Sequence, residues 1–185
     1  RLSAGKNGIV AEFQDANRGS LFYSTDGLNW VEWDFSMEVA SEPIIVGDKF
    51  YFRVNDTFYI TRDGAEWWTK QRQNFLGDMD RDSIVYGNGV FLALGHKDDE
   101  IFSSETIEHW EIQTIRTGVE WRGVSFSDGK FFLWGVAEES GEPDTILTSF
   151  DGRNWSALNI GNEVWRVDEV KQVNGKIIAR QQAQN

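Results

Sequence analysis

The chain has 185 residues, of which 18 are Lys or Arg and 30 are Asp or Glu, so that its net charge is −12. This charge argues against sequence-independent nucleic-acid binding and against docking on an anionic membrane surface, because both need a basic protein surface. The absence of Cys excludes disulfides, Cys-ligated zinc and a cysteine nucleophile. No apolar run approaches the roughly 18 residues of a membrane span. Nine Trp, 13 Phe and 18 Gly beside only two Pro indicate an all-β protein with tight turns.

Five repeats follow one another along the chain, at 1–35, 43–70, 82–113, 122–158 and, as a half repeat, 164–182. Each complete repeat reads as two apolar strands around a tight turn, followed by a third and a fourth strand. In the second repeat we expect the strands at about 43–47, 49–54, 57–62 and 66–70. Four-stranded repeats that recur about every 40 residues are typical of propeller blades.

The turn between the first two strands is marked by Asn-Gly or Asp-Gly in four repeats, at 88–89, 128–129 and 174–175 and, as a weaker copy, at 7–8. These dipeptides between apolar runs predict a type I′ hairpin, because that turn needs positive φ at both central residues. A β-rich run follows each turn where a phosphate-binding loop would need a helix, so we interpret the glycines as turn residues.

The third strand of a repeat ends in the motif Ser/Thr-x-Asp-Gly-x-x-Trp, which occurs at 24–30, 61–67 and 149–155. The Asp can accept hydrogen bonds from nearby backbone N–H groups, the Gly takes positive φ, and the Trp folds under the turn. A degenerate copy runs from Ser103 to Trp110 and lacks Asp-Gly. We interpret this copy as one residue longer, with Thr106 in place of Gly, and therefore predict a turn of different shape.

The two alternating motifs resemble the Asp-box, or BNR repeat, of sialidase-like β-propellers, in the short variant found in bacterial and phage repeat proteins. The resemblance covers nearly the whole chain. It implies an all-β fold, a β-propeller of four-stranded antiparallel blades with four full repeats and a half repeat. Residues 1–185 are expected to form a single propeller domain or a segment of a larger propeller.

The resemblance also implies that the Asp-box residues lie on the blade rim, away from a catalytic face. We therefore interpret them as structural, and we expect the four motif tryptophans to be substantially buried. The residues concerned are Ser24, Asp26, Gly27, Trp30, Asp63, Gly64, Trp67, Trp110, Ser149, Asp151, Gly152 and Trp155.

Candidate ligand-binding residues precede the first strand of three repeats. Arg81, Arg122 and Arg166 hold similar offsets before this strand, and Trp121 and Trp165 stand beside two of them. Guanidinium groups that converge at one end of the propeller would bind a carboxylate, a sulfate or a sugar acid, and the indoles would add a stacking surface. The alternative is that each Arg pairs with a neighbouring carboxylate, from among Asp80, Asp82, Glu120 and Glu163.

No catalytic residue of the sialidases can be assigned here, because no Tyr has an assignable Glu partner. With only His96 and His109 as histidines, we also expect no metal site and no cofactor. We favour a non-catalytic binding or scaffold module that recognises a protein or a glycan. The alternative is a fragment of a sialidase-type glycoside hydrolase.

The charge, the lack of a long apolar run and the incomplete ring of repeats together indicate the expected partners and location. We expect neither nucleic acid nor membrane insertion, and a location outside the cell or on a cell or virion surface. Edge strands of an incomplete ring favour self-association or a ring completed by another chain. Because the sequence begins at Arg1 rather than Met, we expect its start to have been cut, by a signal peptidase or by design.

Overall fold

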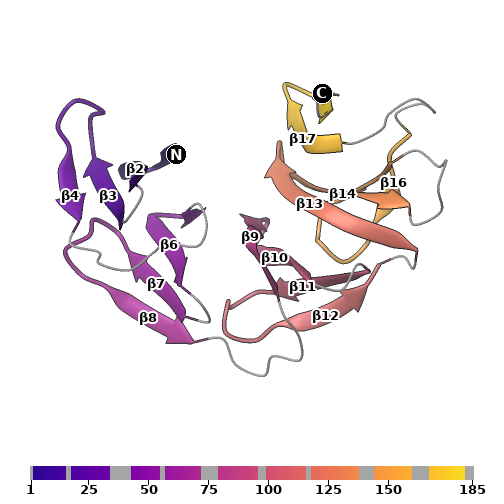
Figure 1. Ribbon diagram of the computed structural model, residues 1–185, viewed down its shortest axis with the longest axis horizontal. Coiled ribbons are helices and arrows are strands. Elements are labelled where there is room, and N and C mark those ends of the chain that lie inside the picture. The colour runs from indigo at the N-terminus through magenta and orange to yellow at the C-terminus, as the bar shows by residue number, and fades with distance from the viewer. Residues whose placement is uncertain are drawn as a thin grey trace. The chain divides into compact units, whose positions relative to one another are not determined.

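The computed structural model describes residues 2–15, 18–33, 43–54, 57–71, 79–95, 99–115, 118–137, 144–159 and 167–181. These residues form 18 β-strands and no helix. The strands make four antiparallel sheets of four strands and one sheet of two strands, each in chain order (Figure 1). The predicted all-β fold class, a β-propeller with four-stranded antiparallel blades, is confirmed.

Every sheet is a run of consecutive strands. The first comprises β1 (Leu2–Gly5), β2 (Gly8–Asp15), β3 (Arg18–Ser24) and β4 (Val31–Trp33). The second comprises β5 (Ile44–Val46), β6 (Lys49–Val54), β7 (Thr57–Thr61) and β8 (Trp68–Gln71). The third comprises β9 (Met79–Gly87), β10 (Val90–Gly95), β11 (Glu100–Ser104) and β12 (Glu111–Thr114). The fourth comprises β13 (Val119–Ser127), β14 (Lys130–Ala137), β15 (Thr145–Ser149) and β16 (Ser156–Ala157), and the last β17 (Val167–Val173) and β18 (Lys176–Gln181).

The hairpin between the first two strands has the predicted backbone in three sheets, whereas in the first sheet Asn7 does not take positive φ and the prediction of a type I′ turn is wrong. Asn88, Asp128 and Asn174 have φ of 47°, 50° and 50°, and the glycines that follow them have φ of 87°, 75° and 73°. Positive φ at both central residues is the requirement of a type I′ turn, whose twist matches that of the strands it joins. The Asn-Gly and Asp-Gly dipeptides therefore set the register of these hairpins.

The first strands of the third and fourth sheets are longer than predicted. β9 begins at Met79 and β13 at Val119, each three residues before the predicted repeat. In β13 the pairing register shifts between Trp121 and Gly123, so that Arg122 is the extra residue of a β-bulge. Arg122 thus lies within the strand and not in the loop before it.

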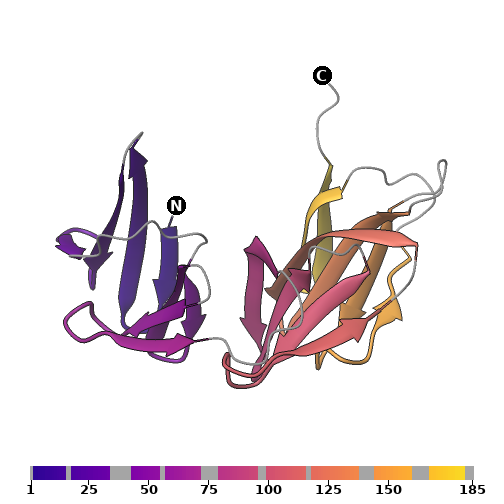
Figure 2. The ribbon, with the colours of Figure 1, turned by 60° about the horizontal axis from the view of Figure 1, so that its bottom comes forward.

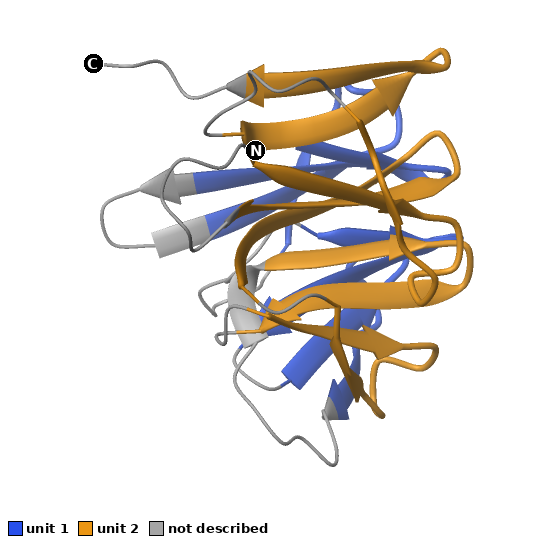
Figure 3. Cartoon of the chain, turned by 90° about the vertical axis from the view of Figure 1, so that its right-hand side faces the viewer, with its two compact units in different colours: residues 1–73 blue, residues 74–185 orange. Residues whose placement is uncertain are grey.

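The chain divides into two compact units, residues 1–73 and residues 74–185 (Figure 3). Within residues 1–73 the first two sheets, indigo and purple in Figure 2, pack face to face. Val10, Leu21 and Trp33 of the first sheet contact Phe50 and Phe52 of the second, and all five are buried. We call the face of a sheet that carries Phe50 and Phe52, or the residues equivalent to them, its near face. The opposite face, which carries Val10, Leu21 and Trp33 or their equivalents, is its far face.

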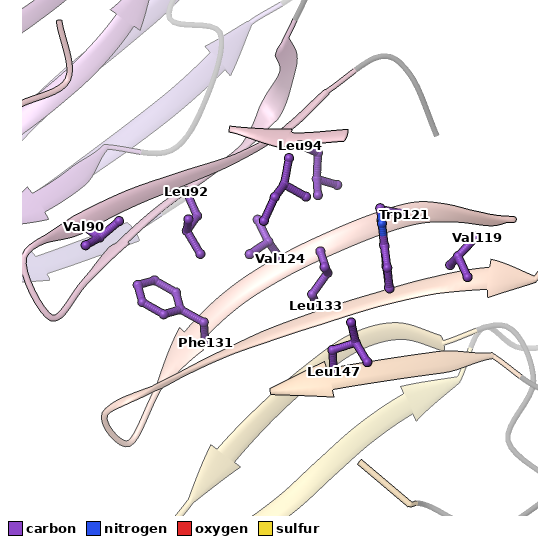
Figure 4. Packing of buried hydrophobic residues seen from close by; sticks show 10 residues of the cluster. Val90, Leu92, Leu94, Val119, Trp121, Val124, Phe131, Leu133 and Leu147 are labelled. Carbon is purple, nitrogen blue, oxygen red and sulfur yellow. The ribbon is translucent and has the colours of Figure 1, made fainter. Parts of the chain in front are cut away.

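Within residues 74–185 the packing of far face on near face recurs twice. Leu92 on the far face of the third sheet lies against Leu133 on the near face of the fourth (Figure 4). The far face of the fourth sheet, with Phe132 and Trp134, packs on Val170 of β17. β13 contacts both β9 and β17, so the first strands of these three sheets are neighbours.

Hydrogen bonds between hairpin turns tie successive sheets together. Asn7 Nδ2 donates to the carbonyl oxygen of Asp48 at 3.2 Å, and Asn88 Nδ2 donates to that of Gly129 at 2.9 Å. In each case the Asn belongs to the hairpin of one sheet and the carbonyl to the hairpin of the next. The residues that shape the hairpins therefore also align neighbouring sheets.

Candidate functional site

The Ser/Thr-x-Asp-Gly-x-x-Trp motifs lie between the third and fourth strands of the complete sheets, as predicted. In the first, Ser24 Oγ accepts from the Gly27 N–H, and Asp26 Oδ1 accepts from the N–H groups of Leu28 and Asn29, all at 2.8 Å. Asn29 Nδ2 donates to the second carboxylate oxygen, also at 2.8 Å. These donors, led by the backbone N–H of Asn29, hold the pKa of Asp26 well below its usual range.

The turn of the fourth sheet repeats this network. Asp151 Oδ1 accepts from the Asn154 N–H and Oδ2 from Asn154 Nδ2, both at 2.7 Å. The two donors of Asn154, the backbone one first, likewise lower the pKa of Asp151. In the second sheet Glu66 stands where the others have Asn, and Asp63 Oδ1 accepts from the Ala65 N–H at 2.9 Å. The carboxylates of these turns are thus occupied by donors of their own turn.

The prediction of a longer, differently shaped turn in the third sheet is wrong. Ser104 and not Ser103 holds the Ser position, because Ser104 pairs with Phe91 just as Ser149 pairs with Phe131 in the fourth sheet. The motif therefore runs over 104–110 with the same spacing as the other three. We refer to 24–30, 61–67, 104–110 and 149–155 as the motif turns.

In the third motif turn Thr106 replaces Asp, and Ile107 replaces Gly. Ser104 Oγ accepts from the Ile107 N–H at 2.9 Å, the bond that Gly27 makes in the first turn. Ile107 has φ of 65°, close to the 75° of Gly27. A β-branched residue seldom takes this conformation. The sequence alone therefore did not indicate that Ile107 aligns with the Gly of the other motif turns. The Ile107 side chain is buried, and this burial offsets the strain.

Three of the four motif tryptophans share a hydrogen bond, which the buried Nε1 of Trp155 lacks among the described residues, and the four differ in burial. Nε1 of Trp30, Trp67 and Trp110 donates to the carbonyl oxygen three residues earlier, at 3.2, 2.9 and 2.7 Å. Trp110 is 7% exposed, Trp67 and Trp155 are half-buried, and Trp30 is 38% exposed. The prediction of substantial burial is therefore wrong for Trp30. Trp67 packs against Trp33 of the preceding sheet, 5.5 Å between ring centroids, whereas no sheet among the described residues lies before the first.

The structure places two of the five predicted ligand-binding residues. Trp121 is buried in the core between the third and fourth sheets, a role that the sequence reasoning did not assign to it. Arg122 is exposed and forms an ion pair with Glu120 at 3.3 Å, which is the local pairing expected under the alternative. The convergence of the arginines stays a prediction. Outside the described residues lie the side chain of Arg81 and the whole of Trp165 and Arg166.

An exposed aromatic ring with two cations beside it lies on the second sheet. Trp68 directly follows the motif Trp and is 41% exposed. Lys49 Nζ and Arg62 Cζ lie 5.8 and 5.9 Å from the centroid of its ring, within the range of cation–π attraction. Arg62 Nε also pairs with Asp48 Oδ2 at 2.9 Å, while no carboxylate among the described residues pairs with Lys49. We call these four residues the Trp68 cluster.

The fourth sheet carries a smaller version of the same arrangement. Phe131 pairs with Ser149, so the next residues outward, Lys130 and Phe150, lie side by side at the end of the sheet. Lys130 Nζ is 5.0 Å from the centroid of the Phe150 ring, which is 65% exposed. Lys49 holds the position of Lys130 in the second sheet. Arg62 holds the motif position of Phe150, and the ring of the second sheet comes instead from Trp68, the residue after the motif Trp. The sequence signal common to both sites is therefore a Lys directly after a hairpin turn.

The described ranges contain neither a candidate metal site nor a candidate membrane-spanning helix. No group of three or more His, Cys, Asp or Glu in them is placed to hold a metal ion. None of them forms a helix of the length and apolarity that a membrane crossing requires. No family model matches the chain, and neither does any curated protein.

Solved structures resemble the chain at low sequence identity. A catalytically inactive variant of virginiamycin B lyase from Staphylococcus aureus matches with 14% identity and a TM-score of 0.60, over 96% of this chain and 61% of that one. A streptogramin B lyase structure matches with 12% identity and a TM-score of 0.58, over 96% and 60%. Trypanosoma rangeli sialidase in complex with the inhibitor DANA matches with 16% identity and a TM-score of 0.51, over 96% and 42%.

At these identities the likeness concerns the fold alone. The sialidase and the virginiamycin B lyase are propellers, in agreement with the sheets described above. The chain covers less than two thirds of the length of each of the three proteins. Its fold is therefore that of a β-propeller.

Proposed function

We propose that this chain is a non-catalytic binding module built from Asp-box repeats, and that its ligand is an acidic glycan. The Trp68 cluster is the observation that carries the proposal. It combines an exposed indole with a lysine that has no carboxylate partner among the described residues. The remaining cation, Arg62, is already paired with Asp48. The cluster therefore offers one apolar ring and one uncommitted positive charge.

The chemistry of this pair fits an acidic sugar. The C–H groups of a pyranose ring pack on an aromatic face, and a carboxylate on the same sugar is attracted by an ammonium group a few ångströms away. Trp68 and Lys49 supply these two features 5.8 Å apart. The protein as a whole carries a charge of −12, so a local positive site is where an anion is attracted.

The motif turns support a structural role for the Asp-box carboxylates. A general acid at neutral pH needs a raised pKa, whereas the N–H donors around Asp26 and Asp151 lower theirs. Asp26, Asp151 and the Asn residues beside them serve to hold the turns. We therefore assign these residues to the fold and the ligand to the exposed Trp68 cluster.

Ligand binding is tested by calorimetric titration with sialyllactose, using lactose as the neutral counterpart. We expect sialyllactose to bind better than lactose. Trp68→Ala is expected to weaken sialyllactose binding by about 1 kcal/mol, or several-fold, because the stacking surface is lost. Lys49→Ala is expected to abolish the preference for sialyllactose, whereas the matched change Lys6→Ala, in the exposed β1–β2 turn, leaves it unchanged.

The same preparation tests the alternative of a sialidase-type glycoside hydrolase. We expect no turnover of a fluorogenic sialoside by the purified chain. Turnover that is lost in Arg81→Ala or Arg122→Ala would refute the non-catalytic proposal. A glycan ligand also accords with a location outside the cell or on a cell or virion surface, which we propose for this chain.

A further inference from the structure

The near face of the first sheet exposes large apolar side chains, whereas the near face of the second sheet packs against the sheet before it. Leu2, Phe13 and Phe22 share this face, because register partners and alternate residues of a strand point to the same side. Phe13 is 62% exposed, and Leu2 is exposed as well. Phe50 and Phe52 on the near face of the second sheet are buried against the sheet that precedes them.

The glycine of the first motif turn shows the same open space. A Cβ at Gly64 would overlap the indole of Trp33, and a Cβ at Gly152 would approach Leu92 at 3.0 Å. Both neighbours belong to the preceding sheet. A Cβ at Gly27 would meet only an atom of its own sheet, at 3.6 Å. The volume that a preceding sheet fills at the second and fourth motif turns is therefore empty at the first.

The far face of the two-stranded sheet also exposes apolar side chains. Val173, Lys176 and Ile178 lie on this face, opposite Val170, which packs on the fourth sheet. Ile178 is 48% exposed and Val173 is exposed beside it. No carboxylate among the described residues pairs with Lys176. None of the described residues thus covers the near face of the first sheet or the far face of the two-stranded sheet.

We propose that a second copy of this chain docks head to tail, with the far face of its β17–β18 sheet on the near face of the first sheet. This contact repeats the far-on-near packing that joins successive sheets within each compact unit. Val173 and Ile178 supply apolar surface toward Leu2 and Phe13. Glu32 is the exposed register partner of Phe22, and its carboxylate complements the ammonium of Lys176.

Such a contact uses different surfaces on the two copies, so that it produces open chains or rings instead of closed two-fold dimers. The proposal is tested by sedimentation velocity over a range of protein concentrations. We expect the wild-type mass to rise above the 21.2 kDa of one chain as concentration increases. Added salt is expected to weaken association in part, because Lys176 and Glu32 contribute only one exposed charge pair.

Two variants block one surface each. Phe13→Asp and Ile178→Asp should both sediment as single chains when measured alone. Mixed in equal amounts, they should form a species of twice the chain mass, because each retains the surface that the other lacks. Val31→Asp is the matched control, since Val31 is 63% exposed on the far face of the same first sheet, and it should assemble as the wild type does.

A wild-type protein that stays a single chain at every concentration would overturn the proposal. So would a mixture of the two variants that fails to associate while each retains the wild-type circular dichroism spectrum. If Phe13→Asp abolished association and Ile178→Asp did not, the contact would be face to face between two first sheets, and the head-to-tail arrangement would be wrong.

Discussion

Replacing Gly64 by Ala tests how successive sheets are joined. Gly64 has φ of 81°, and a Cβ there would overlap the indole of Trp33, which reaches over from the first sheet. Trp33 is buried and its Nε1 donates to the carbonyl oxygen of Asp63 at 2.9 Å. Gly27 is the matched control, because it holds the same motif position in the same compact unit with φ of 75° and has room for a Cβ.

Both substitutions place an Ala at positive φ, but only Gly64→Ala also displaces Trp33. Positive φ costs an Ala about 1–2 kcal/mol in both variants. Displacement of Trp33 adds about 1–3 kcal/mol of overpacking to Gly64→Ala, and loss of its hydrogen bond adds about 1 kcal/mol. We therefore expect Gly64→Ala to lower the free energy of unfolding by about 2–4 kcal/mol more than Gly27→Ala does.

The difference is measured by urea denaturation of the full chain, followed by circular dichroism and by tryptophan fluorescence. A double-mutant cycle adds a check, because Trp33→Ala should cost less in the Gly64→Ala protein than in the wild type. Equal losses for Gly64→Ala and Gly27→Ala would show that Trp33 does not occupy the second motif turn, and the described packing of the first two sheets would be refuted.

Three further predictions concern the motif turns. Trp110→Ala should lower the free energy of unfolding by about 3–5 kcal/mol in urea denaturation, and Trp30→Ala by clearly less, because Trp30 is partly exposed; equal losses would contradict the assigned burial. Thr106→Asp should stabilise the chain by about 1 kcal/mol, because a carboxylate is a stronger acceptor than the Thr hydroxyl for the backbone N–H groups that Asp26 accepts in the first motif turn; a destabilised variant would show that the turns differ. The pKa values of Asp26 and Asp151 are lowered in the folded state, so their stabilisation is complete above about pH 4, the unfolded carboxyl range, and is lost as the pH falls below it. The urea concentration at the midpoint of unfolding should therefore fall as the pH is lowered below about 4 in the wild type, and it should fall less steeply in Asp151→Asn.

The sequence predicts those parts of the fold that depend on local chemistry. The hairpins follow from Asn-Gly and Asp-Gly, since few residues accept positive φ at two successive positions. The motif turns follow from an Asp whose partners lie within three residues of it. Where the local rule is broken, the prediction fails: Ile107 takes the glycine conformation, and only the pairing of Ser104 with Phe91 reveals the true alignment.

The candidate site could not be predicted in the same way, because it depends on contacts between strands. Trp68, Lys49 and Arg62 come from three segments, and only the register of β6, β7 and β8 brings them together. The burial of Trp121 is likewise decided by the neighbouring sheet, since its strand packs between two others. Burial of a tryptophan in a repeat depends on the adjacent repeat as much as on its own motif, as Trp30 and Trp67 show.

Saturation-transfer NMR of the purified chain with sialyllactose tests the central claim most directly, because one sample reports both binding and hydrolysis. We predict saturation transfer from the protein to the sugar protons, clearly weaker transfer in Trp68→Ala at the same concentrations, and no free sialic acid in the spectrum. Free sialic acid that accumulates with time, or saturation transfer that persists unchanged in Trp68→Ala, would contradict it.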